Sequence, residues 1–174
     1  MMETLLNVVA YTLPSVVMLV GVWLVLKKTL RNENNFLTLE LKKQNNNQKL
    51  SVTLRAYERL ILFLERTQPG SILMRQNLST MNCLQLQTVL LKQIRDEFEH
   101  NITQQLYVSR EAWALVCNAK ESLVKLVNLS AGQFETSEAA IKMAEFMIKS
   151  YSESQNPPSE VAINFIKEEV KHIF

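Results

Sequence analysis

The sequence predicts an all-α protein in which one N-terminal transmembrane helix precedes a bundle of about five helices. Three observations support this fold class. The chain of 174 residues is 47% apolar but has only 3 Gly and 4 Pro, a composition that favours helices. After position 50, apolar residues recur every three or four positions, without runs of period two. A long uncharged run lies near the N-terminus.

That uncharged run, Leu5 to Leu26, predicts a membrane span. A helix of this length reaches roughly 33 Å, enough to cross a hydrocarbon core of about 30 Å. A cleaved signal peptide needs positive charge before the run and a cleavage site between small residues after it, and this sequence has neither. A core helix of a small domain is rarely apolar on every side. We therefore expect residues 1–29 to form a transmembrane anchor.

The charges beside the run predict its orientation. Lys27, Lys28 and Arg31 follow it, whereas Glu3 is the only charged side chain before it. Because positive charge collects on the cytoplasmic side of a span, we expect a single-pass protein with its N-terminus outside and its C-terminal domain in the cytoplasm. Asn7 and Ser15 lie on one stripe of the span and either contact another helix or bond locally.

Residues 30–49 are expected to form a basic, Asn/Gln-rich juxtamembrane tether. The first half could extend the membrane helix, and the run Gln44 to Gln48 is typical of a linker. The basic residues of this region are either solvated or in contact with anionic lipid headgroups. From residue 50 onward the chain is nearly neutral, with 13 Lys/Arg and 14 Asp/Glu, which argues against nucleic-acid binding.

Residues 50–174 are expected to form the helical domain. The predicted helices cover about 51–67, 82–104, 110–131, 137–152 and 159–173. Pro69-Gly70 ends the first of them, and a turn or short helical piece covers residues 71–77. Ser109 is a plausible N-cap of the third helix, and Gly132 is its C-terminal stop. Pro157-Pro158 separates the last two helices.

Several strings in this domain carry a family resemblance, namely Leu54 to Leu60, Glu97 to Asn101, Gln104 to Ser109 and Ala112-Trp113. Over about residues 50–132 the chain resembles an uncharacterised family of small single-span membrane proteins from bacteria of the Bacteroidota. The resemblance implies a bacterial inner-membrane location. It implies no activity and no functional residues.

Two Glu-x-x-His pairs are the sharpest candidates for chemistry. They are Glu97 with His100 and Glu169 with His172, which include both histidines of the chain. This spacing places both side chains on one side of a helix, and di-iron bundles use two such pairs. However, His172 lies next to the C-terminus, and Glu97 and His100 lie in a polar stretch. Solvated or capping roles are the alternative to a metal site.

Acidic, amide and aromatic side chains gather at the end of the second predicted helix. They are Glu99, Asn101, Gln104, Gln105 and Tyr107. Such a set suits the recognition of a protein partner. The alternative is that these side chains bond the exposed carbonyls of the helix end.

The sequence contains no nucleophile motif and no glycine-rich phosphate loop. We therefore expect a non-enzymatic, membrane-tethered helical interaction or scaffold domain without a cofactor, which contacts a protein partner or copies of itself. The alternative is a metal-binding, di-iron-like helical bundle that uses the two Glu-x-x-His pairs. A lipid sensor that uses residues 27–49 is a third hypothesis.

Overall fold

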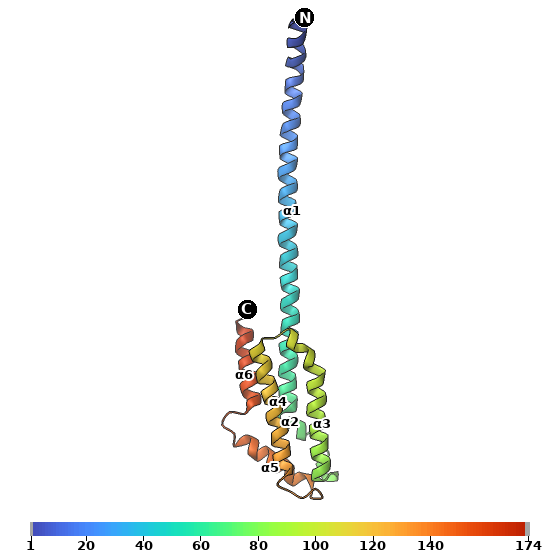
Figure 1. Ribbon diagram of the computed structural model, residues 1–174, viewed down its shortest axis with the longest axis vertical. Helices are drawn as coiled ribbons and strands as arrows, with labels where there is room; N and C mark the ends of the chain where they lie inside the picture. The colour runs from blue at the N-terminus through green and yellow to red at the C-terminus, as the bar shows by residue number, and fades with distance from the viewer. Residues whose placement is uncertain (1, 173–174) are drawn as a thin grey trace. The chain divides into compact units, whose positions relative to one another are not determined.

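A computed structural model describes the backbone of residues 2–172 (Figure 1). Among the first 50 residues it describes the side chains of 2, 17–24, 26–28, 40, 42–44 and 48–50, and it describes those of every later residue up to 172. The chain separates into two compact units, Met1–Leu50 and Ser51–Phe174. The described residues form helices and one isolated β-bridge, so the all-α prediction is confirmed for this part of the chain.

Helix α1 runs from Met2 to Thr67 and passes through both units. The sequence predicted a linker at Gln44 to Gln48, and the backbone there is helical instead. The physical reason is that nothing in this stretch breaks a helix. Neither Gly nor Pro occurs between Gly21 and Pro69, and each Asn or Gln costs at most about 0.7 kcal/mol relative to Ala.

In the N-terminal unit, no helix combines the length and the apolar content of a membrane span within the set of described residues. Most of the predicted span lies outside that set, because the side chains of residues 3–16 are not described. Asn7, Ser15 and Arg31 lie outside it as well. Residues 17–24 are exposed, as are Lys27 and Lys28. The ammonium of Lys27 lies 4.7 Å from the ring centroid of Trp23.

Helix α1 ends where its last side chain satisfies a helix carbonyl. The hydroxyl of Thr67 donates to the carbonyl of Phe63 at 2.8 Å. Helix α2, Pro69–Leu73, follows at once with a proline in its first turn, where the missing N–H costs nothing. The predicted stop at Pro69-Gly70 is therefore also the start of a helix. The 3₁₀ helix η1, Leu78–Thr80, completes this connection.

Helix α3 covers Cys83–Asn101, and the 3₁₀ helix η2 covers Ile102–Leu106. The sequence predicted a helix that extends to residue 104. The α-helix ends earlier than this, at Asn101, and continues as a 3₁₀ helix. Helix α4, Arg110–Ala131, begins and ends as predicted. The Ser109 hydroxyl accepts from the N–H of Ala112 at 3.0 Å, and Gly132 is the C-cap.

Helix α5 covers Ala140–Ser152, and helix α6 covers Pro158–Lys171. The predicted start of α5 at residue 137 is wrong because the preceding residues pair with the start of α3. The N–H of Cys83 donates to the carbonyl of Glu138 at 2.8 Å, and the N–H of Ala140 donates to the carbonyl of Met81 at 3.1 Å. An extended backbone is needed for these bonds, so the helix starts only afterwards.

The core of residues 51–172 consists of two clusters of buried side chains. The upper cluster joins the end of α1 to α4 and α6; its members are Tyr57, Leu60, Phe63, Leu64, Ala112, Val116, Ala119, Ala162, Ile163 and Ile166. The lower cluster joins α2 and α3 to α4 and α5; its members are Ile72, Leu73, Cys83, Leu86, Leu90, Ile94, Leu123, Val127, Ala140, Met143, Ala144 and Met147. Helix α4 contributes to both.

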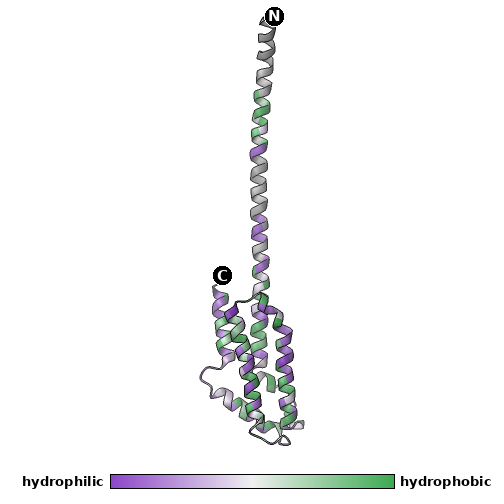
Figure 2. Cartoon of the chain, viewed as in Figure 1, coloured by the Kyte–Doolittle hydropathy of each residue, from purple (hydrophilic) through white to green (hydrophobic). Residues whose placement is uncertain are grey.

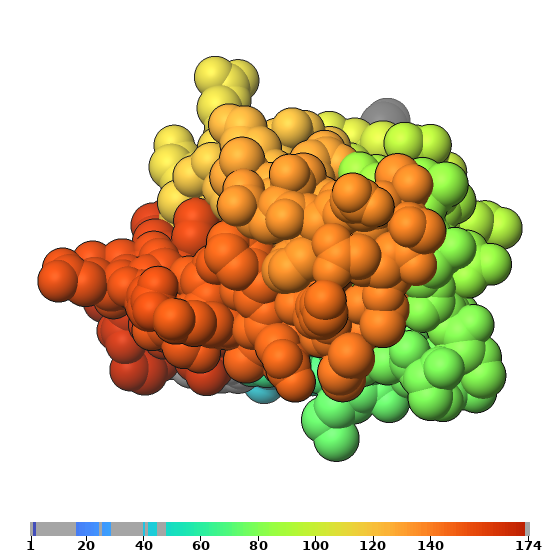
Figure 3. Space-filling model, turned by 90° about the horizontal axis from the view of Figure 1, so that it is seen from below, coloured from blue at the N-terminus to red at the C-terminus, as the bar shows by residue number. Residues whose placement is uncertain are grey.

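Each bundle helix mixes apolar and polar residues along its length, as amphipathic helices do (Figure 2). Seen from below, α5 and the residues that precede it cover the centre of the lower end of the bundle, with the α2–α3 region beside them (Figure 3). The lower cluster is therefore closed off by α5.

Candidate interaction surface

The predicted recognition residues lie on α3, η2 and the turn that follows. Glu99 and Gln105 are exposed, Gln104 is half-buried, and Tyr107 is 47% exposed. Asn101 is only 7% exposed. Its amide donates to the carbonyl of Glu97 at 2.8 Å, and its oxygen accepts from the guanidinium of Arg59 at 3.2 Å. The Asn101 side chain thus links α3 to α1 by hydrogen bonds and is too buried to contact a partner.

Apolar side chains accompany these polar ones at the same end of α3. Ile102 is 43% exposed and Leu106 is 75% exposed. We call Ile102, Leu106 and Tyr107 the η2 patch. Exposed apolar residues are ordinary when scattered, but several together at one helix end are typical of an interaction site. Of this patch, the sequence predicted only Tyr107 as an interaction residue, although Ile102 and Leu106 are apolar residues within a polar stretch.

A groove of about 510 Å³ between α3 and α4 lies beside this patch and includes Ile102. Its apolar lining consists of Leu91, Ile94, Phe98, Ile102 and Val124. Its charged lining consists of Arg95, Glu99, Lys120 and Glu121, two of each sign. An apolar floor with charges along its sides is a suitable surface for an amphipathic helix.

Phe98 is held in this groove by its neighbours. Its ring lies 5.5 Å from that of Trp113 in a stacked arrangement and 5.9 Å from that of Phe63, edge to face. The ammonium of Lys120 lies 4.8 Å from the ring centroid of Phe98 and 2.7 Å from the carboxylate of Glu121. These contacts fix the position of the Phe98 ring in the groove.

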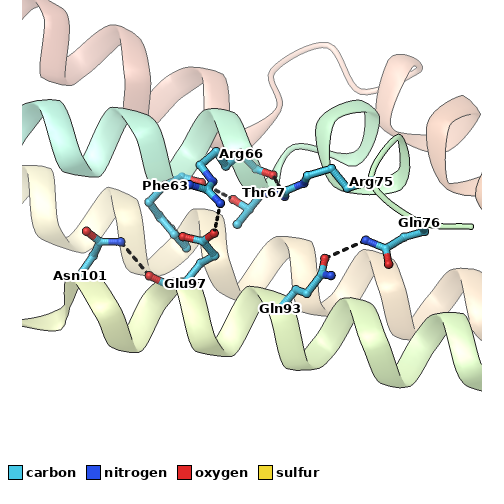
Figure 4. Close-up of polar contacts among 8 residues, drawn as sticks. All are labelled: Phe63, Arg66, Thr67, Arg75, Gln76, Gln93, Glu97 and Asn101. Atoms are coloured by element: carbon cyan, nitrogen blue, oxygen red, sulfur yellow. Dashed lines mark hydrogen bonds and ion pairs between the residues drawn. The ribbon is translucent and has the colours of Figure 1, made fainter.

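On the other side of α3, polar side chains link it to α1 and to the turn that follows α2 (Figure 4). The guanidinium of Arg66 pairs with the carboxylate of Glu97 at 2.8 Å, and that of Arg75 donates to the carbonyl of Arg66 at 2.6 Å. Gln76 donates to Gln93 at 2.9 Å. Because most of these groups are bonded to one another, the arrangement explains how the helices are held together.

The two Glu-x-x-His pairs do not come together as a metal site. Glu97 pairs with Arg66, and Glu169 accepts a hydrogen bond from the Ser109 hydroxyl at 2.9 Å. His172 is the C-cap of α6. Within the described part of the chain, no group of three or more His, Cys, Asp or Glu side chains is placed to hold a metal ion. The metal-binding alternative therefore has no ligand set there.

Ser109 joins three helices instead. Besides capping α4 and donating to Glu169 on α6, it donates its N–H to the hydroxyl of Tyr57 on α1 at 3.2 Å. Burial raises the pKa of Tyr57; the Ser109 bond opposes this shift, and the charge of Glu169 adds to it. The sequence predicted Ser109 as a helix cap. Its bonds to Tyr57 and Glu169 span more than 50 residues of chain, so no local sequence pattern indicates them.

A smaller cavity of about 180 Å³ lies where α4, α5 and α6 meet. Its polar lining consists of Ser122, Ser150, Tyr151, Ser154 and Ser159. Burial raises the pKa of Tyr151, and its buried hydroxyl has no hydrogen-bond partner among protein atoms. The nearby hydroxyl of Ser159 opposes this rise in the pKa of Tyr151, although the two hydroxyl groups do not lie at hydrogen-bond geometry.

Among the described residues, the fold and these surfaces define an all-α protein with grooves between its helices. Residues 3–173 match the model of a family of unknown function, DUF7935. The chain belongs to this family, which covers nearly its whole length and extends beyond the 50–132 region of the resemblance. No curated protein and no solved structure matches the chain.

Proposed function

We propose that this protein is a non-enzymatic interaction module tethered to the bacterial inner membrane. The tether is supported by the uncharged run Leu5 to Leu26 and by the basic residues that follow it. Within the described part of the run, Met18 and Leu19 are 74% and 70% exposed, and Trp23 suits a membrane interface. The positive-inside rule favours a cytoplasmic location for the helical domain.

The interaction role rests on one observation, the α3–α4 groove with the η2 patch at its end. The groove has an apolar floor, sides with charges of both signs and an ordered aromatic residue. Its length along two helices suits an amphipathic helix from a protein partner, which inserts apolar residues at helical spacing. A partner of this kind would cover Ile102, Leu106 and Tyr107, which are otherwise exposed to water.

Photo-crosslinking in the native cell tests this function. A photoreactive amino acid at Leu106 of the full-length chain should give an adduct with another protein, recovered in the membrane fraction after alkaline extraction. Ile102→Asp should reduce the adduct about tenfold or more, because it places a charge in an apolar contact. Ile148→Asp on α5 is the matched control, since Ile102 and Ile148 are 43% and 46% exposed.

Three results would contradict the proposal. Absence of any adduct at Leu106 would mean that no protein partner binds at this surface. Equal loss of adduct with both substitutions would mean that Ile102 has no special role in binding. Release of the full-length chain by alkaline extraction would exclude the transmembrane tether.

A further inference from the structure

A second groove lies on a different face of the bundle, between the end of α1 and α6. Its volume is about 540 Å³, and its apolar floor consists of Leu54, Tyr57, Ile61 and Val170. Leu54 and Ile61 lie seven residues apart on α1, so they share one side of that helix. The floor is mostly apolar, unlike the polar surface between α1 and α3.

The two sides of this groove differ in charge. Glu58 stands on the α1 side. The α6 side carries Lys167 and Lys171 together with Glu168, and Lys171 pairs with Glu168. Lys167 is exposed and adds a positive charge opposite the negative charge of Glu58. Helix α6 runs in the opposite direction to the part of α1 that lies in the bundle, so the two helices are antiparallel (Figure 1).

We propose that the α1–α6 groove binds a second copy of this chain and makes the protein a homodimer. A two-fold axis parallel to the groove places α1 of each copy against α6 of the other. Glu58 of one copy then faces Lys167 of its partner, and the symmetry forms this contact twice. Both copies have residue 51 at the same end of the dimer, as two chains tethered to one membrane surface require.

The charge pattern is the reason for choosing a second copy as the occupant. A groove with one negative and one positive side is complementary to itself under this symmetry, whereas a helix from another protein would need a matching pattern of its own. The inference rests on the proposed interaction role but uses a different face, so the η2 patch stays available to another partner.

A charge-swap experiment tests the dimer. The full-length chain, its Glu58→Lys variant and its Lys167→Glu variant are each purified in mild detergent, and their masses are measured by light scattering over a range of concentrations. Each single variant places like charges at both symmetric contacts, so we expect its dissociation constant to rise about tenfold or more. The wild type should be dimeric at concentrations where each variant is monomeric.

Mixing the two variants gives the decisive comparison. In the mixed dimer, one contact keeps the native Glu58 and Lys167, and the other contact joins the two substituted positions, whose charges are again opposite. We therefore expect the mixture to return to dimers of wild-type affinity. The double variant should do the same, because both of its contacts join opposite charges. Circular dichroism of each variant checks that it is folded.

A wild type that stays monomeric at all concentrations would overturn the inference, as would single variants that dimerise like the wild type or a mixture that stays monomeric. These results are separable from those for the proposed function. A monomeric chain that still gives the Leu106 adduct would contradict only the dimer. A dimer that gives no such adduct would contradict only the proposed partner surface between α3 and α4.

Discussion

At the scale of single residues, Tyr57 shows how one hydroxyl supports the fold. It lies in the upper cluster at 4% exposure and accepts the N–H of Ser109 at the start of α4. That N–H is one of the donors that a helix start leaves without a partner inside the helix. The phenol thus contributes apolar area to the core and an acceptor to the end of a neighbouring helix.

This arrangement predicts a pH dependence of stability. Tyr57→Phe should lower the free energy of unfolding by about 0.5–1.5 kcal/mol near pH 8, because a hydrogen bond is lost. The pKa of Tyr57 is raised in the folded protein, so its stabilising contribution is present below the unfolded value of about 10 and is lost as the pH rises through the folded value. The difference between wild type and variant should therefore shrink above about pH 10.

Urea unfolding of both proteins across this pH range measures the difference. Subtracting the variant's free energy of unfolding from that of the wild type removes the contributions of the other titrating groups, which both proteins share. A difference that stays constant or grows at high pH would contradict the role assigned to the Tyr57 hydroxyl.

Residue roles that depend on neighbours in the chain could be predicted from the sequence, and those that depend on distant residues could not. Ser109 and Gly132 cap α4 as predicted, because capping is decided within about four residues. The oxygens of Glu97 and Glu169 bond to Arg66 and Ser109, which are far away in sequence. A pattern within one helix holds no information about such partners.

At the scale of elements, helix interiors were predictable but two helix ends and one junction were not. The start of α5 is delayed because residues before it pair with residues 81–84, and this pairing depends on the tertiary fold. The run Gln44 to Gln48 remains helical because it contains no residue that breaks a helix. Polar composition alone is therefore not enough to predict a non-helical linker.

The start of α3 gives a prediction at this scale. Asn82 and Gln85 form a reciprocal capping box, with bonds of 2.9 and 3.1 Å between each side chain and the other's N–H. Asn82→Ala should lower the free energy of unfolding by about 1 kcal/mol, whereas Asn82→Asp should nearly preserve it.

Asn118→Ala is the matched control, because Asn118 is exposed in the interior of α4, where Ala is the better helix former. Urea unfolding should find that this control is as stable as the wild type or slightly more stable. Equal destabilisation by the two alanine substitutions would mean that the side chain of Asn82 does not cap α3.

At the scale of the whole molecule, α4 connects the two clusters of buried side chains. It places Ala112, Val116 and Ala119 in the upper cluster and Leu123 and Val127 in the lower one. Helix α6 packs mainly on α4 in the upper cluster, and α5 packs on α4 in the lower one. Loss of either cluster removes the packing that stabilises one half of α4. Because α4 is one continuous helix, its other half should then be destabilised as well.

We therefore predict that damage to one cluster unfolds both. Ile166→Ala in the upper cluster and Met147→Ala in the lower one each remove a fully buried side chain and should each lower the free energy of unfolding by about 2–5 kcal/mol.

Trp113 reports on the upper cluster by fluorescence in a Trp23→Phe background. Cys83, whose pKa is raised by burial, reports on the lower cluster by thiol labelling in a Cys117→Ser background. In urea the two signals should change at the same midpoint in the wild type and move down together in both variants. If Met147→Ala exposed Cys83 to labelling at urea concentrations where Trp113 keeps its native fluorescence, the two clusters would unfold independently, and α4 would not couple them.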